Sequence, residues 1–223
     1  MKFSLLRRVA AEFLGTGFLV AAVVGSGIMG ERLSGGNAAI ALLANTLATG
    51  AALVFLILVF LPISGAHLNP VVSLTEALRG GITPRETGCY VAAQICGGIA
   101  GAACADVMFA LPVFSISHHA RAGGPQWFSE FVATFGLLLV IRTVARFTPN
   151  WLPIAVAAYI VAAYWFTASA SFANPAVTIA RSLSDTFAGI RPTDVPAFLA
   201  AQLAGGFSAA IIADWLIRRP SKA

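Results

Sequence analysis

Charged side chains are scarce in this sequence of 223 residues. Lys, Arg, Asp and Glu together make up 10% of the residues, whereas hydrophobic residues make up 58%. A water-soluble domain carries roughly a quarter charged residues, because water must solvate its surface. The deficit excludes a soluble globular fold and indicates a protein that lies in a lipid bilayer.

Residue types that bind metals or perform catalysis are also few. The three histidines are dispersed, and Cys89, Cys96 and Cys104 fall within one apolar segment that has no histidine in metal-ligand register. We interpret these cysteines as small buried hydrophobic residues. Because the sequence also lacks a Gly-rich loop ending in Gly-Lys-Ser/Thr, we expect no enzyme, no metal site, no cofactor and no ATP site.

Long apolar stretches are abundant. Each is long enough for a helix to cross the hydrocarbon of a bilayer, which takes about 20 residues. Six such stretches are present: 9–29, 37–61, 84–110, 126–147, 151–169 and 194–217. The first is too long for the apolar part of a secretory signal, so we expect a permanent span. We predict one all-α membrane domain over residues 1–223.

The positions of Lys and Arg predict how the spans are oriented. With six spans, both termini and two connections share one face, with ten cations: Lys2, Arg7, Arg8, Arg79, Arg85, Arg142, Arg146, Arg218, Arg219 and Lys222. The opposite face has four: Arg32, Arg121, Arg181 and Arg191. Because cytoplasmic loops are enriched in cations, we expect both termini in the cytoplasm. The cations form no basic stripe, so the net charge of +5 does not indicate a nucleic-acid partner.

The two halves of the chain, about residues 1–112 and 124–223, repeat three short patterns in the same order. Residues 12–16 correspond to 130–134, residues 66–72 to 171–177, and residues 94–98 to 202–206. Because each half contains three spans, the second half must be inverted in the membrane relative to the first.

Each half also contains an Asn-Pro pair in a connection too short to cross the membrane, Asn69-Pro70 and Asn174-Pro175. Asparagine is a preferred N-cap and proline suits the first helical position, so each pair predicts a short helix, ending near Arg79 and near Ser184. The two helix starts enter from opposite faces and should meet in mid-membrane. Their partial positive charge there would repel cations and admit neutral solutes.

Non-helical backbone at membrane depth has to be buried or line a wet cavity. We therefore expect these loop residues to line a pore: Gly65, Ala66, His67, Ser169, Ala170 and Ser171. The amides of Asn69 and Asn174 would add donors for a passing oxygen atom. We expect the intramembrane carboxylates Glu12 and Glu130 to accept hydrogen bonds from the loops rather than to carry protons. For His67, whose ordinary pKa is about 6.5, a structural role in the loop is favoured over a pH gate.

These features resemble the major intrinsic proteins, the aquaporins and aquaglyceroporins. The resemblance covers essentially the whole chain and is carried by the paired Asn-Pro segments, by Ala11-Glu12-Phe13 and by Ser64-Gly65-Ala66-His67. It implies a right-handed bundle of six transmembrane helices plus two re-entrant half-helices. It also implies a homotetramer with one pore in each monomer, and we expect it in a bacterial inner membrane.

The sequence departs from the family pattern in both triplets. The usual Asn-Pro-Ala is Asn69-Pro70-Val71 in the first copy, which adds two methyl groups where the half-helices should touch; the second copy is regular, Asn174-Pro175-Ala176. Where the family places an arginine after the second triplet, this chain has Val177. Spacing from the triplets gives a small, uncharged selectivity filter: Thr49, Ala162, Ser171 and Val177. We expect Arg181 to be a helix-end cation near Asp185 rather than a pore residue.

An open, uncharged filter favours linear polyols, urea and neutral metalloid hydroxides over water alone. Residues 171–181 are similar to a bacterial branch of aquaglyceroporin-like proteins that includes members of arsenic-resistance operons, which implies arsenite or related arsenicals as solutes. Two alternatives stay open at this point. One is a channel mainly for water, and the other is an ion-coupled secondary transporter, which would need an ion site at the midplane.

Overall fold

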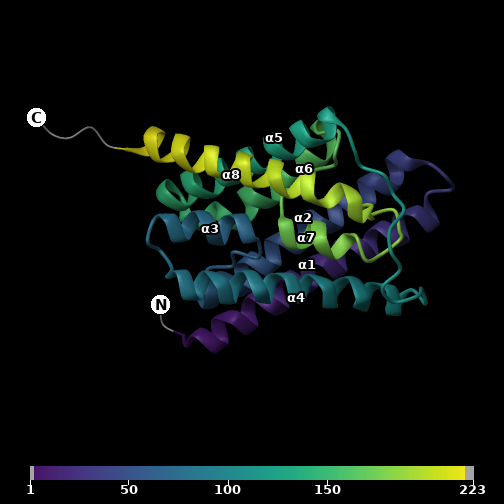
Figure 1. Ribbon diagram of the computed structural model, residues 1–223, viewed down its shortest axis with the longest axis horizontal. Helices are drawn as coiled ribbons and strands as arrows, with labels where there is room; N and C mark the ends of the chain where they lie inside the picture. Colours follow the sequence, from purple (N-terminus) through teal and green to yellow (C-terminus); the bar gives the residue numbers. More distant parts are fainter. Residues whose placement is uncertain (1–2, 219–223) are drawn as a thin grey trace, which may run out of the picture.

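The computed structural model describes residues 3–218, and this part of the chain contains helices and connecting segments but no strand (Figure 1). Six long helical segments within it are apolar enough to cross a membrane: α1 (Leu5–Leu33), α2 (Ala38–Ser64), α4 (Pro84–Met108), α5 (Gly124–Phe147), α6 (Leu152–Phe166) with the 3-10 turn Pro149–Trp151 before it, and α8 (Val195–Ile217) with the 3-10 turn Pro192–Asp194 before it. Two short helices lie between them: α3 (Pro70–Leu78) and α7 (Pro175–Arg181). The predicted all-α fold with six spans and two half-helices is confirmed.

The two repeats are arranged alike. Helix α1 packs on α4 and helix α5 packs on α8, while α2 and α6 join the halves. Helix α1 begins and helix α8 ends at the same end of the bundle, which we call the terminal end; the opposite end is the far end (Figure 1). Both half-helices pack against α4 and α8, so each of them touches both repeats.

Glycines allow the long helices to approach closely. A Cβ atom added at Gly97 would lie 2.2 Å from the carbonyl oxygen of Phe13, and one at Gly101 would lie 2.1 Å from that of Gly17. In the second repeat a Cβ atom at Gly205 would lie 2.3 Å from the carbonyl oxygen of Phe131. Because lipid offers no hydrophobic drive between helices, such backbone contact is a main source of their packing energy.

Val71, the unusual residue of the first triplet, is fully buried and is accommodated by a glycine of α8. A Cβ atom at Gly206 would lie 2.1 Å from Cγ1 of Val71. A methyl group of the valine therefore lies against α8. The sequence predicts the extra methyl groups at the contact between the half-helices, whereas the structure places one of them against Gly206.

Some details differ from the sequence-based expectations. Helix α7 ends at Arg181 and not near Ser184, because Ser182 and Leu183 turn back to Ile179 and Ala180 through tighter hydrogen bonds. The cysteines were expected to be buried, but Cys89 is half-buried and two others are exposed: Cys96 and Cys104. In a bilayer a small apolar side chain can face lipid at no cost, which removes the reason to bury it.

The contact between Val71 and Gly206 can be tested by stability. We expect Gly206→Ala to lower the free energy of unfolding by about 1–3 kcal/mol, because the new methyl group overpacks the site. The double variant Gly206→Ala/Val71→Ala should recover most of the loss, measured as thermal unfolding in detergent. Gly88→Ala is the matched control, since a Cβ atom there meets nothing within 4 Å. Additive losses in the double variant would contradict the contact.

Candidate functional site

The two half-helix starts meet and bind each other. The side-chain oxygen of Asn69 accepts a hydrogen bond from the Val71 amide at 2.9 Å, and that of Asn174 accepts one from the Ala176 amide at 3.0 Å. The Asn69 side chain also donates to the carbonyl of Ala173 at 2.8 Å. In return the Asn174 side chain donates to the carbonyl of Leu68 at 2.7 Å. Each amide has a second N–H, which is available to a solute.

Glu12 of α1 is completely buried and holds the loop before α3. Its Oε1 accepts hydrogen bonds from the hydroxyl of Ser64 at 2.5 Å and from the His67 amide at 3.0 Å. Its Oε2 accepts from the Leu68 amide at 2.7 Å and from the side-chain amide of Gln94 at 2.8 Å. One carboxylate thus satisfies four donors.

Glu130 of α5 makes the equivalent set of bonds to the loop before α7. Its Oε1 accepts from the hydroxyl of Ser169 at 2.6 Å and from the Phe172 amide at 2.9 Å. Its Oε2 accepts from the Ala173 amide at 2.9 Å and from the side chain of Gln202 at 2.6 Å. The inverted repeat therefore reproduces the support of the loop as well as its path.

The supported loops are strained. Ala66 and Leu68 have φ values of 47° and 48°, and the equivalent residues Ser171 and Ala173 both have 48°. The left-handed region disfavours residues other than glycine, and each such residue costs about 1–3 kcal/mol. The hydrogen bonds to the buried carboxylates offset this cost and keep the loops extended along the cavity.

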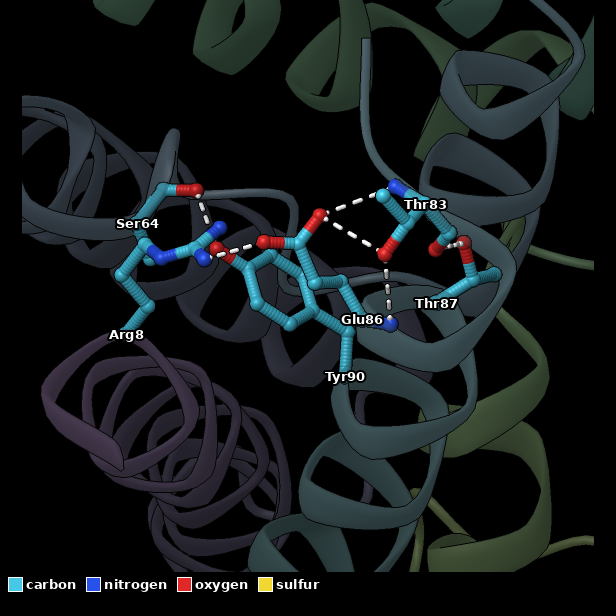
Figure 2. Close-up of polar contacts among 6 residues, drawn as sticks. All are labelled: Arg8, Ser64, Thr83, Glu86, Thr87 and Tyr90. Atoms are coloured by element: carbon cyan, nitrogen blue, oxygen red, sulfur yellow. Dashed lines mark hydrogen bonds and ion pairs between the residues drawn. The ribbon is translucent and has the colours of Figure 1, made fainter. Parts of the chain in front are cut away.

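A second set of contacts ties the first loop to the terminal end of the bundle. Figure 2 shows the hydroxyl of Tyr90 donating to the carbonyl of Ser64, at 2.8 Å. One turn earlier in α4, Glu86 pairs with Arg8 of α1 and closes a capping box with Thr83. These bonds fix the start of α4 relative to α1 and to the end of α2.

A cavity of about 270 Å³ passes the junction of the half-helices. One wall consists of aliphatic side chains from four long helices: Leu19, Val23, Leu53, Ile57, Leu61, Leu137, Ile141, Val156 and Ile160. The other consists of loop and half-helix residues: Gly65, Ala66, His67, Leu68, Asn69, Ser171, Phe172, Ala173, Asn174 and Val177. The ring of His67 lies 3.0 Å from the hydroxyl of Ser73, measured from Nδ1 to Oγ. The cavity is amphipathic along its length.

Three of the four residues predicted for the filter line the cavity: Thr49, Ser171 and Val177. The prediction for Ala162 is wrong, because this residue is exposed on the outer surface. Ile160 and Tyr164 face the cavity instead, since residues four apart share a helix face, and Ala162, two residues from each, points away. The hydroxyls of Thr49 and Tyr164 lie 3.3 Å apart. The outer part of the cavity therefore has an aromatic residue, which we did not expect.

The predicted loop residues are placed differently in the two repeats. In the first repeat all three line the cavity: Gly65, Ala66 and His67. In the second repeat Ser169 and Ala170 do not, because the hydroxyl of Ser169 is turned to Glu130; the lining begins at Ser171 and continues through Phe172. The other triplet residues are buried beside the cavity: Pro70, Val71, Pro175 and Ala176.

Arg181 also differs from its prediction, because it lines the cavity. Asp185, its expected partner, instead accepts hydrogen bonds from the His118 amide at 2.9 Å and from its ring at 3.1 Å. These two bonds lower the pKa of the Asp185 carboxyl. The spacing of four residues after Val177 placed Arg181 on the correct helix face, but the partner of Asp185 lies in a distant loop.

Two glutamines bind the carboxylates and were not among the predicted site residues: Gln94 and Gln202. Gln94 also donates to the hydroxyl of Ser73 at 2.9 Å, and Gln202 donates to that of Thr178 at 2.9 Å. Both glutamines recur at matched positions of the two repeats, so the repeat itself was the signal that could have identified them.

Comparison with known proteins places this geometry in a family. The sequence profile described as major intrinsic protein matches residues 1–152. Aquaglyceroporin AqpS of Rhizobium meliloti (strain 1021) is 54% identical over 217 residues, which is 97% of this chain and 93% of the relative. The chain belongs to the major intrinsic protein family. As a member of it, the protein is a multi-pass membrane channel for small neutral solutes and not an enzyme.

Two further proteins share less sequence with this chain. Aquaporin NIP3-1 of Oryza sativa subsp. japonica is 33% identical over 156 residues, which is 65% of this chain and 47% of the relative. The X-ray structure of the aquaglyceroporin from Plasmodium falciparum superposes with a TM-score of 0.76 at 23% identity, covering 96% of this chain and 97% of that one. The superposition supports the aquaporin-like fold.

The role of the buried carboxylates in this channel can be tested by Glu130→Gln. The NH2 group of the new glutamine would lie against groups that are themselves hydrogen-bond donors, so we expect a loss of stability of about 1–3 kcal/mol. We also expect lower permeation of every solute, with the order of permeation among the solutes unchanged. Glu31→Gln, an exposed carboxylate at the end of α1, is the control. Thermal unfolding and flux into proteoliposomes measure both effects. If Glu130 carried protons, the wild-type flux would depend on a pH gradient and the variant's would not.

Proposed function

We propose that this channel is aquaglyceroporin-like and conducts arsenite, other neutral metalloid hydroxides or related arsenicals, and small polyols. The observation that carries the proposal is Val177, an uncharged side chain on the cavity at the position where the family places an arginine. Without a guanidinium at that level, the opening is wider and less polar than a filter for water alone. Width and hydrogen-bonding groups decide which neutral solutes pass a pore.

The cavity suits a solute that has hydroxyls on one side and carbon atoms or a metalloid on the other. The aliphatic wall can cover the apolar side, while the loops opposite present polar groups. Near Val177 the hydroxyls of Thr49 and Tyr164 can each donate and accept a hydrogen bond. Arsenous acid is uncharged at neutral pH and has three hydroxyls, so it matches a polyol in shape and in hydrogen bonding. We assign the filter to these residues: Thr49, Tyr164, Ser171 and Val177.

Two further observations support the choice of solute class. The relative from Rhizobium meliloti, 54% identical, is named an aquaglyceroporin. In addition, residues 171–181 resemble the branch that includes members of arsenic-resistance operons. A channel mainly for water is the competing proposal, and the solute panel below separates the two.

Passive conduction is favoured over ion-coupled transport because of how the buried carboxylates are used. Glu12 and Glu130 each accept four hydrogen bonds from the protein. A coupled transporter keeps an ion or proton site at the midplane. Both carboxylates are already bound by backbone and side-chain donors, so neither is available as an ion or proton site.

We further propose one channel domain over residues 1–223, built from inverted repeats of about 1–112 and 124–223, that assembles as a homotetramer in a bacterial inner membrane. The terminal end would face the cytoplasm, because seven described cations lie there: Arg7, Arg8, Arg79, Arg85, Arg142, Arg146 and Arg218. Lys2, Arg219 and Lys222 lie outside the described residues. The mass of the purified protein, corrected for detergent, tests the tetramer.

The solute class is tested with one reconstituted preparation. Water, glycerol, urea and arsenite fluxes into proteoliposomes should all exceed those of empty vesicles, should not saturate as a carrier's do, and should not depend on an ion gradient. Water permeation without any glycerol or arsenite permeation would refute the proposal in favour of a water channel.

Val177→Arg should reduce arsenite and glycerol fluxes by about tenfold or more while water permeation survives, because a guanidinium narrows the opening. Val177→Leu is the matched control, since it adds bulk without charge or donors, and we expect a smaller reduction. Both variants are compared with wild type at equal protein content in light-scattering and uptake assays. An unchanged arsenite flux in Val177→Arg would remove this residue from the filter.

A further inference from the structure

Arg181 ends the half-helix α7 and lies at the far-end part of the cavity. The residue is only 3% exposed, and its guanidinium lies over the ring of Phe172, 3.4 Å from the centroid. Its Nε donates to the carbonyl of Ala188. Within residues 3–218 the two terminal nitrogens have no hydrogen-bond partner and no carboxylate at ion-pair distance. These two nitrogens are the donors of Arg181 that a solute in the cavity can reach.

A second arginine on the same aromatic ring shows the contrast. Arg121 lies 5.0 Å from the centroid of Phe172, but its Nε donates to the carbonyl of Gly189 at 2.8 Å and its Nη1 to that of Ser169 at 3.4 Å. Its Nη2 donates to the carbonyl of Phe187, also at 3.4 Å. Arg121 does not line the cavity. The donors of Arg121 hold loops, whereas the two terminal nitrogens of Arg181 are unbound within the described residues.

The two carboxylates of the connection between α7 and α8 are bound elsewhere. Asp185 pairs with His118, and Asp194 pairs with Arg191 at 2.9 Å. The charge of Arg181 is therefore not neutralised by a direct ion pair among the described residues. Of the residues that line the cavity within the described chain, Arg181 is the one Lys or Arg.

The position of Arg181 relative to Val177 gives this charge a function. Residues four apart lie on the same helix face, separated by about 6 Å along the axis. Arg181 is thus displaced by one turn toward the far-end mouth from the level at which Val177 leaves the opening uncharged. A fixed cation one turn from Val177 leaves the opening at Val177 wide, but every solute that enters from the far end still passes close to it.

We propose that Arg181 is a specificity-determining residue of this pore. Its charge at the far-end mouth excludes cations, while its two unbound terminal nitrogens donate hydrogen bonds to neutral solutes that carry oxygen atoms. In a low-dielectric mouth the repulsion of a second cation is strong. Hydroxyl or carbonyl oxygens of a neutral solute can instead accept hydrogen bonds from Nη1 and Nη2. Because Arg181 acts on solutes that enter the pore, its role rests on the proposed function.

Urea and guanidinium are the probes, because they have nearly the same size and shape and differ in charge. Wild-type proteoliposomes should take up urea and exclude guanidinium. In Arg181→Gln, guanidinium uptake should rise by about tenfold or more, since the repelling charge is gone. Arg181→Lys should keep most of the exclusion. The double variant Val177→Arg/Arg181→Gln, which moves the charge one turn inward, should again exclude guanidinium.

Arg32→Gln is the charge-matched control, because it removes an exposed arginine from the far end and should leave the urea-to-guanidinium ratio unchanged. Water permeation and thermal unfolding check that each variant is folded. If glutamine disturbs the loop, Arg181→Met, whose linear side chain can keep the contact with Phe172, replaces it in the same comparison.

The outcomes separate the two proposals. If Arg181→Gln excludes guanidinium as well as wild type does and still conducts urea, the role of Arg181 is overturned and the proposed function stays intact. Wild-type vesicles that conduct water but no urea, glycerol or arsenite would overturn the proposed function. In that case guanidinium uptake by Arg181→Gln above that of empty vesicles would still support the charge barrier, and no uptake would refute it.

Discussion

The loops that line the pore have amide groups that lipid cannot satisfy, and Glu12 and Glu130 supply the acceptors that these amides need. Each carboxylate binds two successive backbone amides as well as two side chains. The bonds stabilise left-handed conformations at alanine, leucine and serine that would otherwise be costly. Without them the two half-helices would lose the loops that position their N-termini at the centre of the membrane.

The inverted repeat uses this arrangement twice and then joins the copies. Asn69 binds the carbonyl of Ala173 and Asn174 binds that of Leu68, so neither half-helix start can move independently. The partial positive charges of both helix N-termini are thereby held at one level of the pore. A neutral solute with oxygen atoms is favoured there, and a cation is not.

The two repeats differ at a few positions that line or adjoin the cavity. Val71 replaces the alanine of the first triplet and is matched by Gly206, so the departure is absorbed by packing. Arg181 and Glu76 occupy equivalent positions 105 residues apart, and both line the cavity. The cavity lining therefore has a cation toward the far end and a carboxylate toward the terminal end, where Glu76 lies 4.0 Å from Arg79. Because Glu76 cannot repel cations, the barrier proposed for Arg181 belongs to one end only.

The sequence by itself determined the membrane class, the six spans and the two capped half-helices, because hydrophobic length and N-cap chemistry are local properties. It also determined the inverted repeat, because matching segments can be recognised by comparing the two halves of the sequence. It also selected Thr49, Ser171 and Val177 as candidates for the filter. Only the tertiary structure decided that Tyr164 and not Ala162 faces the cavity, and that Arg181 lies there while Asp185 binds His118. Helix rotation and the partners of loop side chains depend on packing between segments distant in the chain, and no spacing along one segment specifies them.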